Sequence, residues 1–254
     1  MAPSLVVLQS VVSYLMLPTY FLVAWVFYRR GLWSSYRYFL MGILLEGFAS
    51  GLSLATMRVK GAQKLIYLTA QPVLCFLYVL MVIEVFRKVF IRFPGIARFA
   101  QRFIVASMLV AFIFALATAG GDVHKGATTV QYYSAATRTI TTALCAYLLF
   151  IAAFLVWMPV PLPLNSIRHG FLMFFYFIAT TAVHYEVNIG NLTMIKMVNL
   201  LLYVITLIAL LSWAWLLQPS GELAPSGQGL PRTGVSTLLN RLESINKTLS
   251  PPEE

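Results

Sequence analysis

Apolar residues fall into seven long, nearly uninterrupted stretches, and most of the charged residues lie between them. Each stretch is close to the roughly 20 residues that a helix needs to cross a bilayer core of about 30 Å. The stretches are Leu5–Tyr28, Tyr38–Thr56, Leu65–Phe86, Phe103–Ala119, Tyr132–Trp157, Gly170–Tyr185 and Thr193–Leu217. Continuous apolar runs predict helices rather than the alternating segments of a membrane β-barrel. The pattern therefore predicts an all-α bundle of seven transmembrane helices over residues 1–217.

The composition supports a membrane protein. Of the 254 residues, 60% are hydrophobic and only 10% are charged, whereas soluble domains carry about 25% charged residues. Cys75 and Cys145 both lie within apolar stretches, where a free cysteine packs as a small hydrophobic residue. The lipid bilayer is therefore the first partner that the sequence predicts.

The distribution of Lys and Arg predicts the orientation, because cytoplasmic loops of membrane proteins are enriched in these cations. Twelve of the 18 cations follow the first, third, fifth and seventh stretches, and the densest group lies between Arg87 and Arg102. We expect these segments inside, so that the N-terminus is outside and the C-terminus is cytoplasmic. Cations that face anionic lipid then explain the net charge of +10, and no nucleic-acid partner is expected.

The composition changes at Gln218, which predicts a cytoplasmic tail over residues 218–254. Residues 219–231 are rich in Pro, Gly and Ser and are expected to form a flexible linker. Apolar residues at three- and four-residue spacing predict an amphipathic helix over residues 232–249. Such a helix is marginal in water when isolated, so we expect it to dock on the lipid surface, a second copy of the chain, a protein partner or the bundle itself. The residues expected at this cytoplasmic interface are Arg87, Lys88, Arg92, Arg98, Arg102, Leu238, Leu242 and Ile245.

One acid lies deep inside a predicted span. Glu46 is near the middle of the second stretch, with no other charge within eight residues on either side. Because a charge inside the bilayer is costly, such an acid is a candidate functional site. It could carry a proton, bind a cation or anchor a polar ligand. Alternatively, it could join helices through hydrogen bonds from donors such as Gln71, Tyr78, Ser107 or a hydroxyl-bearing neighbour. A G-x-x-x-G pair that begins at Gly47 permits another helix to approach this face closely.

A second acid, Glu84, lies at the inner end of the third stretch. Arg87 and Lys88 follow it by three and four residues, a spacing that places them on the same helix face. We therefore expect a local ion pair between Glu84 and these cations.

A polar cluster is expected at the outer end of the bundle. Its members come from the ends of the fifth, sixth and seventh stretches and are Tyr133, Arg138, His184, Glu186 and Lys196. Two cations, a carboxylate and aromatic walls suit an anionic or polar small molecule. The alternative is ordinary anchoring at the membrane surface, where Tyr, Lys and Arg are enriched.

Motifs for catalysis are absent from the sequence. It contains no nucleophile elbow, zinc-protease motif or phosphate-binding loop. The three histidines are spread along the chain, so neither a metal site nor a haem site is predicted, and no cofactor is expected. We therefore expect a protein that is not an enzyme.

Residues 67–102, above all the run V-I-E-V-F-R-K-V-F-I-R-F-P-G-I, resemble a family of uncharacterised bacterial seven-helix membrane proteins. That family resembles, more distantly, the membrane sensor regions of histidine kinases. The resemblance implies a protein of the bacterial inner (plasma) membrane with a role in sensing.

Three hypotheses about function follow. The first is a sensor, binding or accessory subunit that recognises a small polar or lipid-like ligand and signals through its cytoplasmic face. The second is a small proton- or cation-coupled carrier or channel that uses Glu46. The third is a structural subunit of a larger membrane complex.

Overall fold

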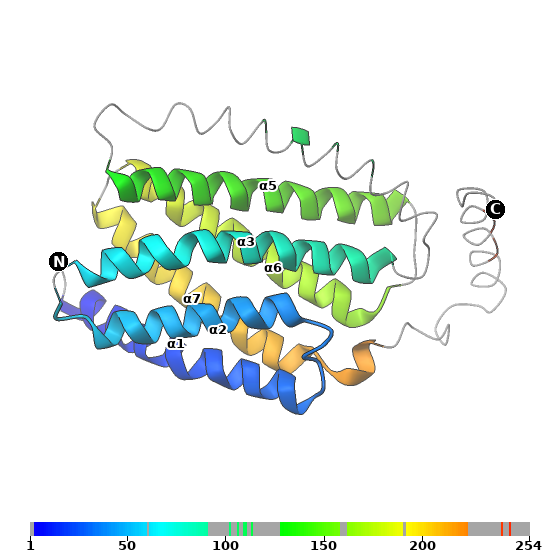
Figure 1. Ribbon diagram of the computed structural model, residues 1–254, viewed down its shortest axis with the longest axis horizontal. Helices are drawn as coiled ribbons and strands as arrows, with labels where there is room; N and C mark the ends of the chain where they lie inside the picture. The colour runs from blue at the N-terminus through cyan, green and yellow to red at the C-terminus, as the bar shows by residue number, and fades with distance from the viewer. Residues whose placement is uncertain are drawn as a thin grey trace.

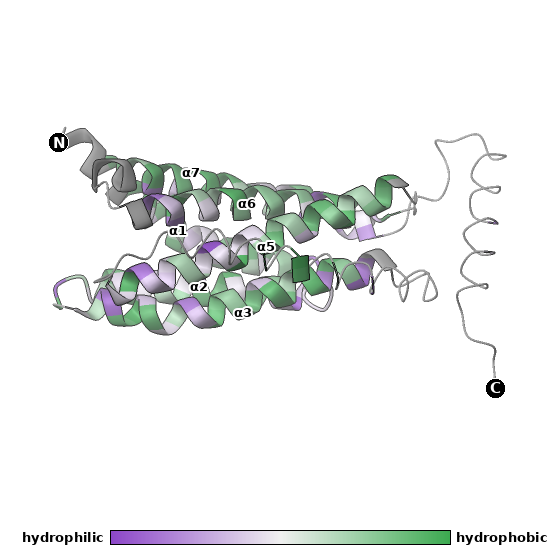
Figure 2. Cartoon of the chain, turned by 90° about the horizontal axis from the view of Figure 1, so that it is seen from above, coloured by the Kyte–Doolittle hydropathy of each residue, from purple (hydrophilic) through white to green (hydrophobic). Residues whose placement is uncertain are grey.

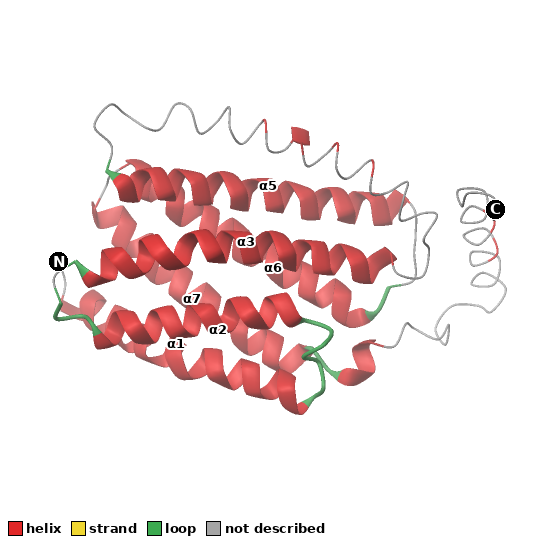
Figure 3. Ribbon diagram, viewed as in Figure 1, coloured by secondary structure: helices red, strands yellow, loops and turns green. Residues whose placement is uncertain are grey.

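The computed structural model describes residues 3–59, 61–90, 128–157, 162–189 and 192–222, together with the isolated positions 102, 106, 109, 110, 113, 240 and 244. These residues form long helices joined by short turns, and no strand occurs among them (Figure 3). The helices are α1 (Pro3–Arg29), α2 (Arg37–Ala55), α3 (Ala62–Phe90), α5 (Thr129–Trp157), α6 (Leu164–Ile189) and α7 (Leu192–Leu216), followed by a short 3₁₀ helix, η1 (Pro219–Glu222). The all-α prediction is confirmed for the described part of the chain.

Six helices in the described part are long and apolar enough to cross a membrane. They correspond to six of the seven predicted spans. Large apolar side chains cover the outside of the bundle, among them Trp25, Phe48 and Trp215, and Figure 2 shows the mainly hydrophobic colouring of the helices. Because so much exposed apolar surface is unusual for a protein in water, the described part of the chain is an integral membrane bundle.

The predicted fourth span, Phe103–Ala119, falls almost wholly outside the described residues. The positions described within or beside it are Arg102, Ala106, Leu109, Val110 and Ile113, and each of them is helical. The structure therefore leaves the count of seven spans as a prediction.

The helices α3 and α5 run in the same direction. Near their N-terminal ends, Gln71 of α3 donates a hydrogen bond to the Thr137 hydroxyl of α5 at 3.3 Å. Near their C-terminal ends, Val85 of α3 lies with Leu148 and Ile151 of α5 around one cavity. Figure 1 shows the two helices side by side, both beginning at the end of the bundle where the N-terminus lies. The chain therefore leaves α3 at one end of the bundle and enters α5 at the opposite end.

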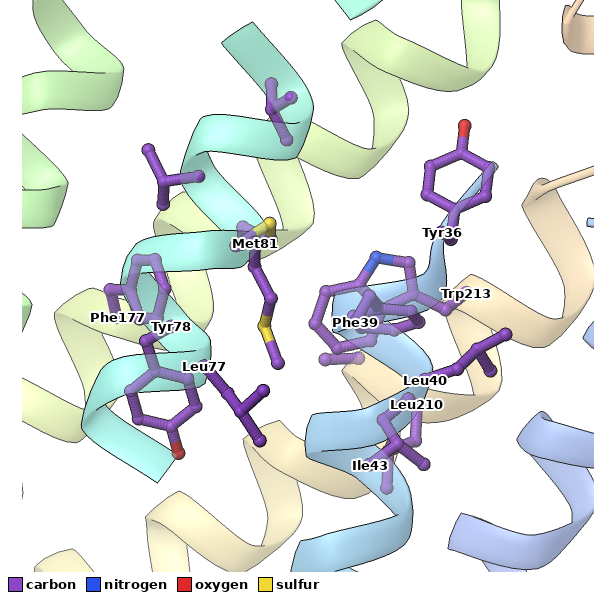
Figure 4. Packing of buried hydrophobic residues seen from close by; sticks show 14 of the residues in the cluster. Tyr36, Phe39, Leu40, Ile43, Leu77, Tyr78, Met81, Phe177, Leu210 and Trp213 are labelled. Atoms are coloured by element: carbon purple, nitrogen blue, oxygen red, sulfur yellow. The ribbon is translucent and has the colours of Figure 1, made fainter. Parts of the chain in front are cut away.

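The core is built from aromatic and aliphatic side chains of all six long helices in the described part of the chain. Phe39 and Trp213 pack with ring centroids 4.5 Å apart, and Met81 lies between this pair and the Tyr78–Phe177 pair (Figure 4). The predicted close approach at the glycine pair is confirmed, because a Cβ at Gly47 would lie 3.1 Å from the Cβ of Tyr20 on α1. This contact brings α1 against the face of α2 that carries Glu46.

The helix α6 begins earlier than its apolar stretch indicates. The sequence predicts a start at Gly170, but the helix starts at Leu164. The added turn includes Asn165, Ser166 and His169, all of which are buried. Hydropathy alone misses these polar residues because they are covered by η1 and neighbouring helices rather than by lipid.

Candidate functional site

Glu46 lies at the meeting point of four helices. Its Oε1 accepts hydrogen bonds from the hydroxyl of Tyr78 on α3, at 2.7 Å, and from that of Tyr176 on α6, at 2.8 Å. The two hydroxyls are themselves 2.9 Å apart. The Tyr20 hydroxyl of α1 also interacts with the Glu46 carboxyl. Tyr78 was one of the predicted donors, whereas Tyr176 and Tyr20 were not foreseen. Glu46 thus joins α2 to three other helices, in agreement with the joining role considered from the sequence.

A polar cavity of about 440 Å³ lies beside Glu46, between α1, α2, α3 and α7. We call it the Tyr20 cavity, because Tyr20 both lines it and acts on the Glu46 carboxyl. Its hydrogen-bonding residues are Ser13, Tyr14, Tyr20, Ser50, Ser53, Gln63, Tyr67, Gln71 and Tyr203. None of these side chains carries a formal charge at neutral pH. The cavity is therefore suited to water or to a neutral hydrogen-bonding molecule.

A second cavity, of about 870 Å³, lies between α5, α6 and α7. We call it the Arg138 cavity. Its polar residues are Arg138, Thr142, Thr181, Tyr185 and Glu186, and its apolar residues are Cys145, Ile178, Ala182, Val198 and Leu201. The Arg138 guanidinium carbon lies 5.6 Å from the centroid of the Tyr185 ring. The cavity thus combines a cation and a carboxylate with an apolar wall.

The predicted outer cluster is brought together only in part. Arg138 and Glu186 share the Arg138 cavity, but His184 points to Ser134, whose hydroxyl lies 2.9 Å from His184 Nδ1. Tyr133 does not line the cavity. Lys196 belongs to α7, but its side chain lies outside the described residues.

Threonine hydroxyls hold α5 in place beside the Arg138 cavity. Thr137, Thr139 and Thr141 each donate a hydrogen bond to the carbonyl four residues earlier, which satisfies the hydroxyl within its own helix. Thr141 also lies 2.7 Å from the Thr181 hydroxyl of α6. Such bonds matter in lipid, where an unsatisfied polar group finds no water.

A polar cluster closes the opposite end of the bundle, and we call its four members, Tyr36, Lys88, Asn165 and Glu222, the Glu222 cluster. Lys88 Nζ lies 2.9 Å from Glu222 Oε2 and 3.4 Å from the centroid of the Tyr36 ring. Glu222 Oε1 accepts hydrogen bonds from the Tyr36 hydroxyl, at 2.6 Å, and from Asn165 Nδ2, at 2.9 Å. Lys88 therefore pairs with Glu222 of η1. Neither Lys88 nor Arg87 forms the predicted ion pair with Glu84 in the described part of the chain, so that prediction is wrong.

The contacts of Glu222 shift the pKa values of this cluster outside the membrane spans. Burial raises the pKa of Glu222, but the hydrogen bonds from Tyr36 and Asn165 and the charge of Lys88 outweigh it and hold the pKa below its ordinary value. Burial and the hydrogen bond to Glu222 raise the pKa of the Tyr36 hydroxyl well above its usual range. At neutral pH the cluster thus contains a charged Glu222 and a neutral Tyr36.

Two arginines hold the end of α7 next to this cluster. Arg30 donates hydrogen bonds to the carbonyls of Ala214 and Leu217, and Arg168 donates one to Leu216 O at 2.7 Å. These carbonyls belong to the last turn of α7 and to the residue that follows it, where no further helix amides are available to bind them. The residues 219–222 therefore continue from a fixed helix end, and the predicted flexible linker begins no earlier than after Glu222.

His169 is enclosed by aromatic rings close to the Glu222 cluster. Its ring lies 4.9 Å from those of both Tyr36 and Phe39, and it is only 1% exposed. Neither ring nitrogen has a hydrogen-bond partner within the described part of the chain. No group of three His, Cys, Asp or Glu side chains that could hold a metal ion occurs among the described residues.

The predicted cytoplasmic interface is described only in part. Arg87 and Arg102 are exposed, and Lys88 is half-buried in the Glu222 cluster. Arg92, Arg98, Leu238, Leu242 and Ile245 lie outside the described residues.

Comparison of the chain with protein-family models, with curated proteins and with solved structures gave no match.

Proposed function

We propose that this protein is a non-enzymatic membrane sensor or binding subunit that holds an amphipathic molecule with an anionic headgroup in the Arg138 cavity. The observation that supports the proposal is the cavity of about 870 Å³ in which Arg138 and Glu186 meet an apolar wall. This volume is within the range of small-molecule sites, roughly 300–1,000 Å³.

The lining residues indicate the class of ligand. The Arg138 guanidinium can bind a phosphate or carboxylate through paired hydrogen bonds, and Glu186, Thr142 and Thr181 can bind hydroxyl groups of the same headgroup. The apolar wall, which includes Ile178 and Leu201, suits a hydrocarbon chain. A phospholipid with hydroxyl groups on its head, such as phosphatidylglycerol, has all of these features.

A seventh span between α3 and α5 is part of the proposal. Because α3 and α5 run in the same direction, residues 91–127 must connect opposite ends of the bundle. In a membrane this connection requires an odd number of crossings, and the apolar stretch Phe103–Ala119 provides one. Seven crossings agree with an outer N-terminus and a cytoplasmic C-terminus, which place the Arg138 cavity on the outer side of a bacterial inner membrane.

The helices α6 and α7 extend from the cavity to the Glu222 cluster, to which α6 contributes Asn165 and which includes Glu222 of η1, just after α7. At their outer halves α6 and α7 contribute Glu186 and Leu201 to the cavity. At their inner ends Asn165 of α6 donates a hydrogen bond to the carbonyl of Gln218, just after α7, at 2.7 Å. A ligand that changes the separation of α6 and α7 would therefore act on η1 and on the tail that follows it. This gives the proposed sensor an output at its cytoplasmic face.

The binding proposal is tested by lipid retention. The intact chain in mild detergent is titrated with phosphatidylglycerol, and bound lipid is counted by native mass spectrometry. Replacing Arg138 with Gln is expected to weaken retention, whereas Arg58→Gln, which removes the same charge from an exposed site after α2, is expected to leave it unchanged. Equal retention by both variants would refute the proposal.

A further inference from the structure

Three oxygen atoms form a closed triangle at Glu46. They are Oε1 of Glu46 and the hydroxyl oxygens of Tyr78 and Tyr176, separated by 2.7, 2.8 and 2.9 Å. Each separation is a hydrogen-bond distance for O–H···O. Every edge of the triangle needs one proton, so three protons are required. The two tyrosines supply two, and a protonated Glu46 carboxyl supplies the third. In that state Oε1 of Glu46 donates to one tyrosine hydroxyl and accepts from the other, and the two tyrosines share the remaining hydrogen bond.

An ionised Glu46 does not fit the triangle. With two protons for three edges, one pair of oxygens would face each other without a hydrogen between them. In the described part of the chain, the groups that interact with the carboxyl are the hydroxyls of Tyr78, Tyr176 and Tyr20. Tyr203 of α7 in turn interacts electrostatically with Tyr20. No Lys, Arg or His is among the groups that act on Glu46 in the described part of the chain. The described surroundings of Glu46 thus offer hydroxyl groups but no counter-charge.

The Tyr20 cavity lies between this site and the predicted outer end of the bundle, where Met57 and Gln63 line it. Ser50 lies one helical turn after Glu46 on the same face of α2, and it lines the cavity together with Ser53 and Gln71. Glu46 itself is partly exposed although it lies near the middle of a span. Hydroxyl and amide groups of this kind can hold a chain of water molecules.

We propose that Glu46 is a proton-binding site that is neutral at pH 7 and exchanges its proton with the outer side through the Tyr20 cavity. Loss of the proton leaves the carboxylate with two donated hydrogen bonds and removes the third edge of the triangle. The lost edge is the one between the hydroxyls of Tyr78 and Tyr176, so proton release weakens the contact between α3 and α6. This site is separate from the Arg138 cavity and does not depend on the ligand proposed there.

Infrared difference spectroscopy of the full chain in lipid nanodiscs tests the protonation state. The spectrum of the wild type minus that of Glu46→Gln at pH 7 is expected to contain the C=O stretch of a protonated carboxylic acid. Glu186→Gln serves as the matched control and is expected to leave this band in place. A difference spectrum that contains only carboxylate bands would overturn the proposal. If Glu46→Gln does not fold, Tyr78→Phe replaces it, and a shift of the same band is expected because one edge of the triangle is lost.

The exchange route is tested by transfer into D₂O. The carboxylic band of the wild type is expected to shift as deuterium replaces the proton. Ser50→Leu, which fills the Tyr20 cavity, is expected to slow this shift several-fold, while Thr69→Leu, at an exposed site on α3, is expected to leave its rate unchanged. An equal rate in Ser50→Leu and the wild type would overturn the proposed route.

Discussion

Replacing Glu222 with Gln measures how firmly η1 is held against the bundle. The substitution keeps the size of the side chain and an oxygen that can accept hydrogen bonds from Tyr36 and Asn165, but it removes the negative charge. Lys88 then loses its ion-pair partner at 2.9 Å, although it still lies over the Tyr36 ring. The effect of the substitution is therefore mainly that of the ion pair.

The exposure of the two side chains sets the magnitude. Lys88 and Glu222 are 17% and 25% exposed, so the pair is neither fully exposed nor fully buried. Exposed pairs contribute about 0–1 kcal/mol, and breaking a fully buried pair costs about 3–5 kcal/mol. We expect a loss of about 2 kcal/mol in the free energy of local opening of η1, which corresponds to a roughly 30-fold increase in the open population.

Hydrogen exchange of the full chain in nanodiscs, followed by mass spectrometry of peptides that contain residues 218–222, measures this opening. Faster exchange is expected in Glu222→Gln and also in Lys88→Met, and the double variant is expected to be less affected than the sum of the two. Additive effects of the two single substitutions, or unchanged exchange in Glu222→Gln, would refute the assignment of the ion pair as the contact that holds η1.

Two further predictions concern the same end of the bundle. The pKa of Glu222 is lower in the folded protein than its ordinary value of 4.5. The ionised Glu222 carboxylate therefore stabilises the fold fully above pH 4.5, and this stabilisation is lost as the pH falls through the lowered pKa. The melting temperature of the wild type in detergent is therefore expected to fall in this acid range by more than that of Glu222→Gln; equal falls would contradict the assignment. Gly221→Ala is expected to loosen η1, because its Cβ would overlap Oδ1 of the hydrogen-bonded Asn165. Gly42→Ala is expected to be tolerated, because its Cβ would meet only the far end of the flexible Met81 side chain. Hydrogen exchange of residues 218–222 compares the two variants, and equal effects would show that the Gly221–Asn165 contact is unimportant.

Much of the helical bundle could be predicted because its signals are local. Apolar stretches about 20 residues long are visible along the chain, and six of them form helices in the described part. The start of α6 could not be placed in this way, since Asn165 and His169 are polar residues whose burial depends on distant segments. The same is true of η1, whose Pro, Gly and Ser residues are typical of a flexible segment.

The candidate sites, too, could be predicted only where their signals are local in the sequence. Glu46 could be identified from its depth in an apolar stretch, and Tyr78 as a donor to it, but the choice of Tyr176 depends on how α6 packs. The ion pair of Lys88 joins residues that are 134 positions apart, and no spacing rule connects such residues. Local spacing favoured Glu84 instead.

Helix geometry explains why the outer cluster formed only in part. Successive residues of an α-helix are about 100° apart, because one turn contains 3.6 residues. His184 and Glu186 are therefore on nearly opposite faces of α6, and only Glu186 lines the Arg138 cavity. His184 faces Ser134 of α5 instead.

We propose that a ligand in the Arg138 cavity acts on η1 at the other end of α6 and α7. Hydrogen exchange of residues 218–222 in nanodiscs with and without phosphatidylglycerol, on a phosphatidylcholine background, tests it most directly. Phosphatidylglycerol is expected to change this exchange in the wild type and in Arg58→Gln but not in Arg138→Gln. The same response in Arg138→Gln and the wild type, or no response in any of the three proteins, would contradict it.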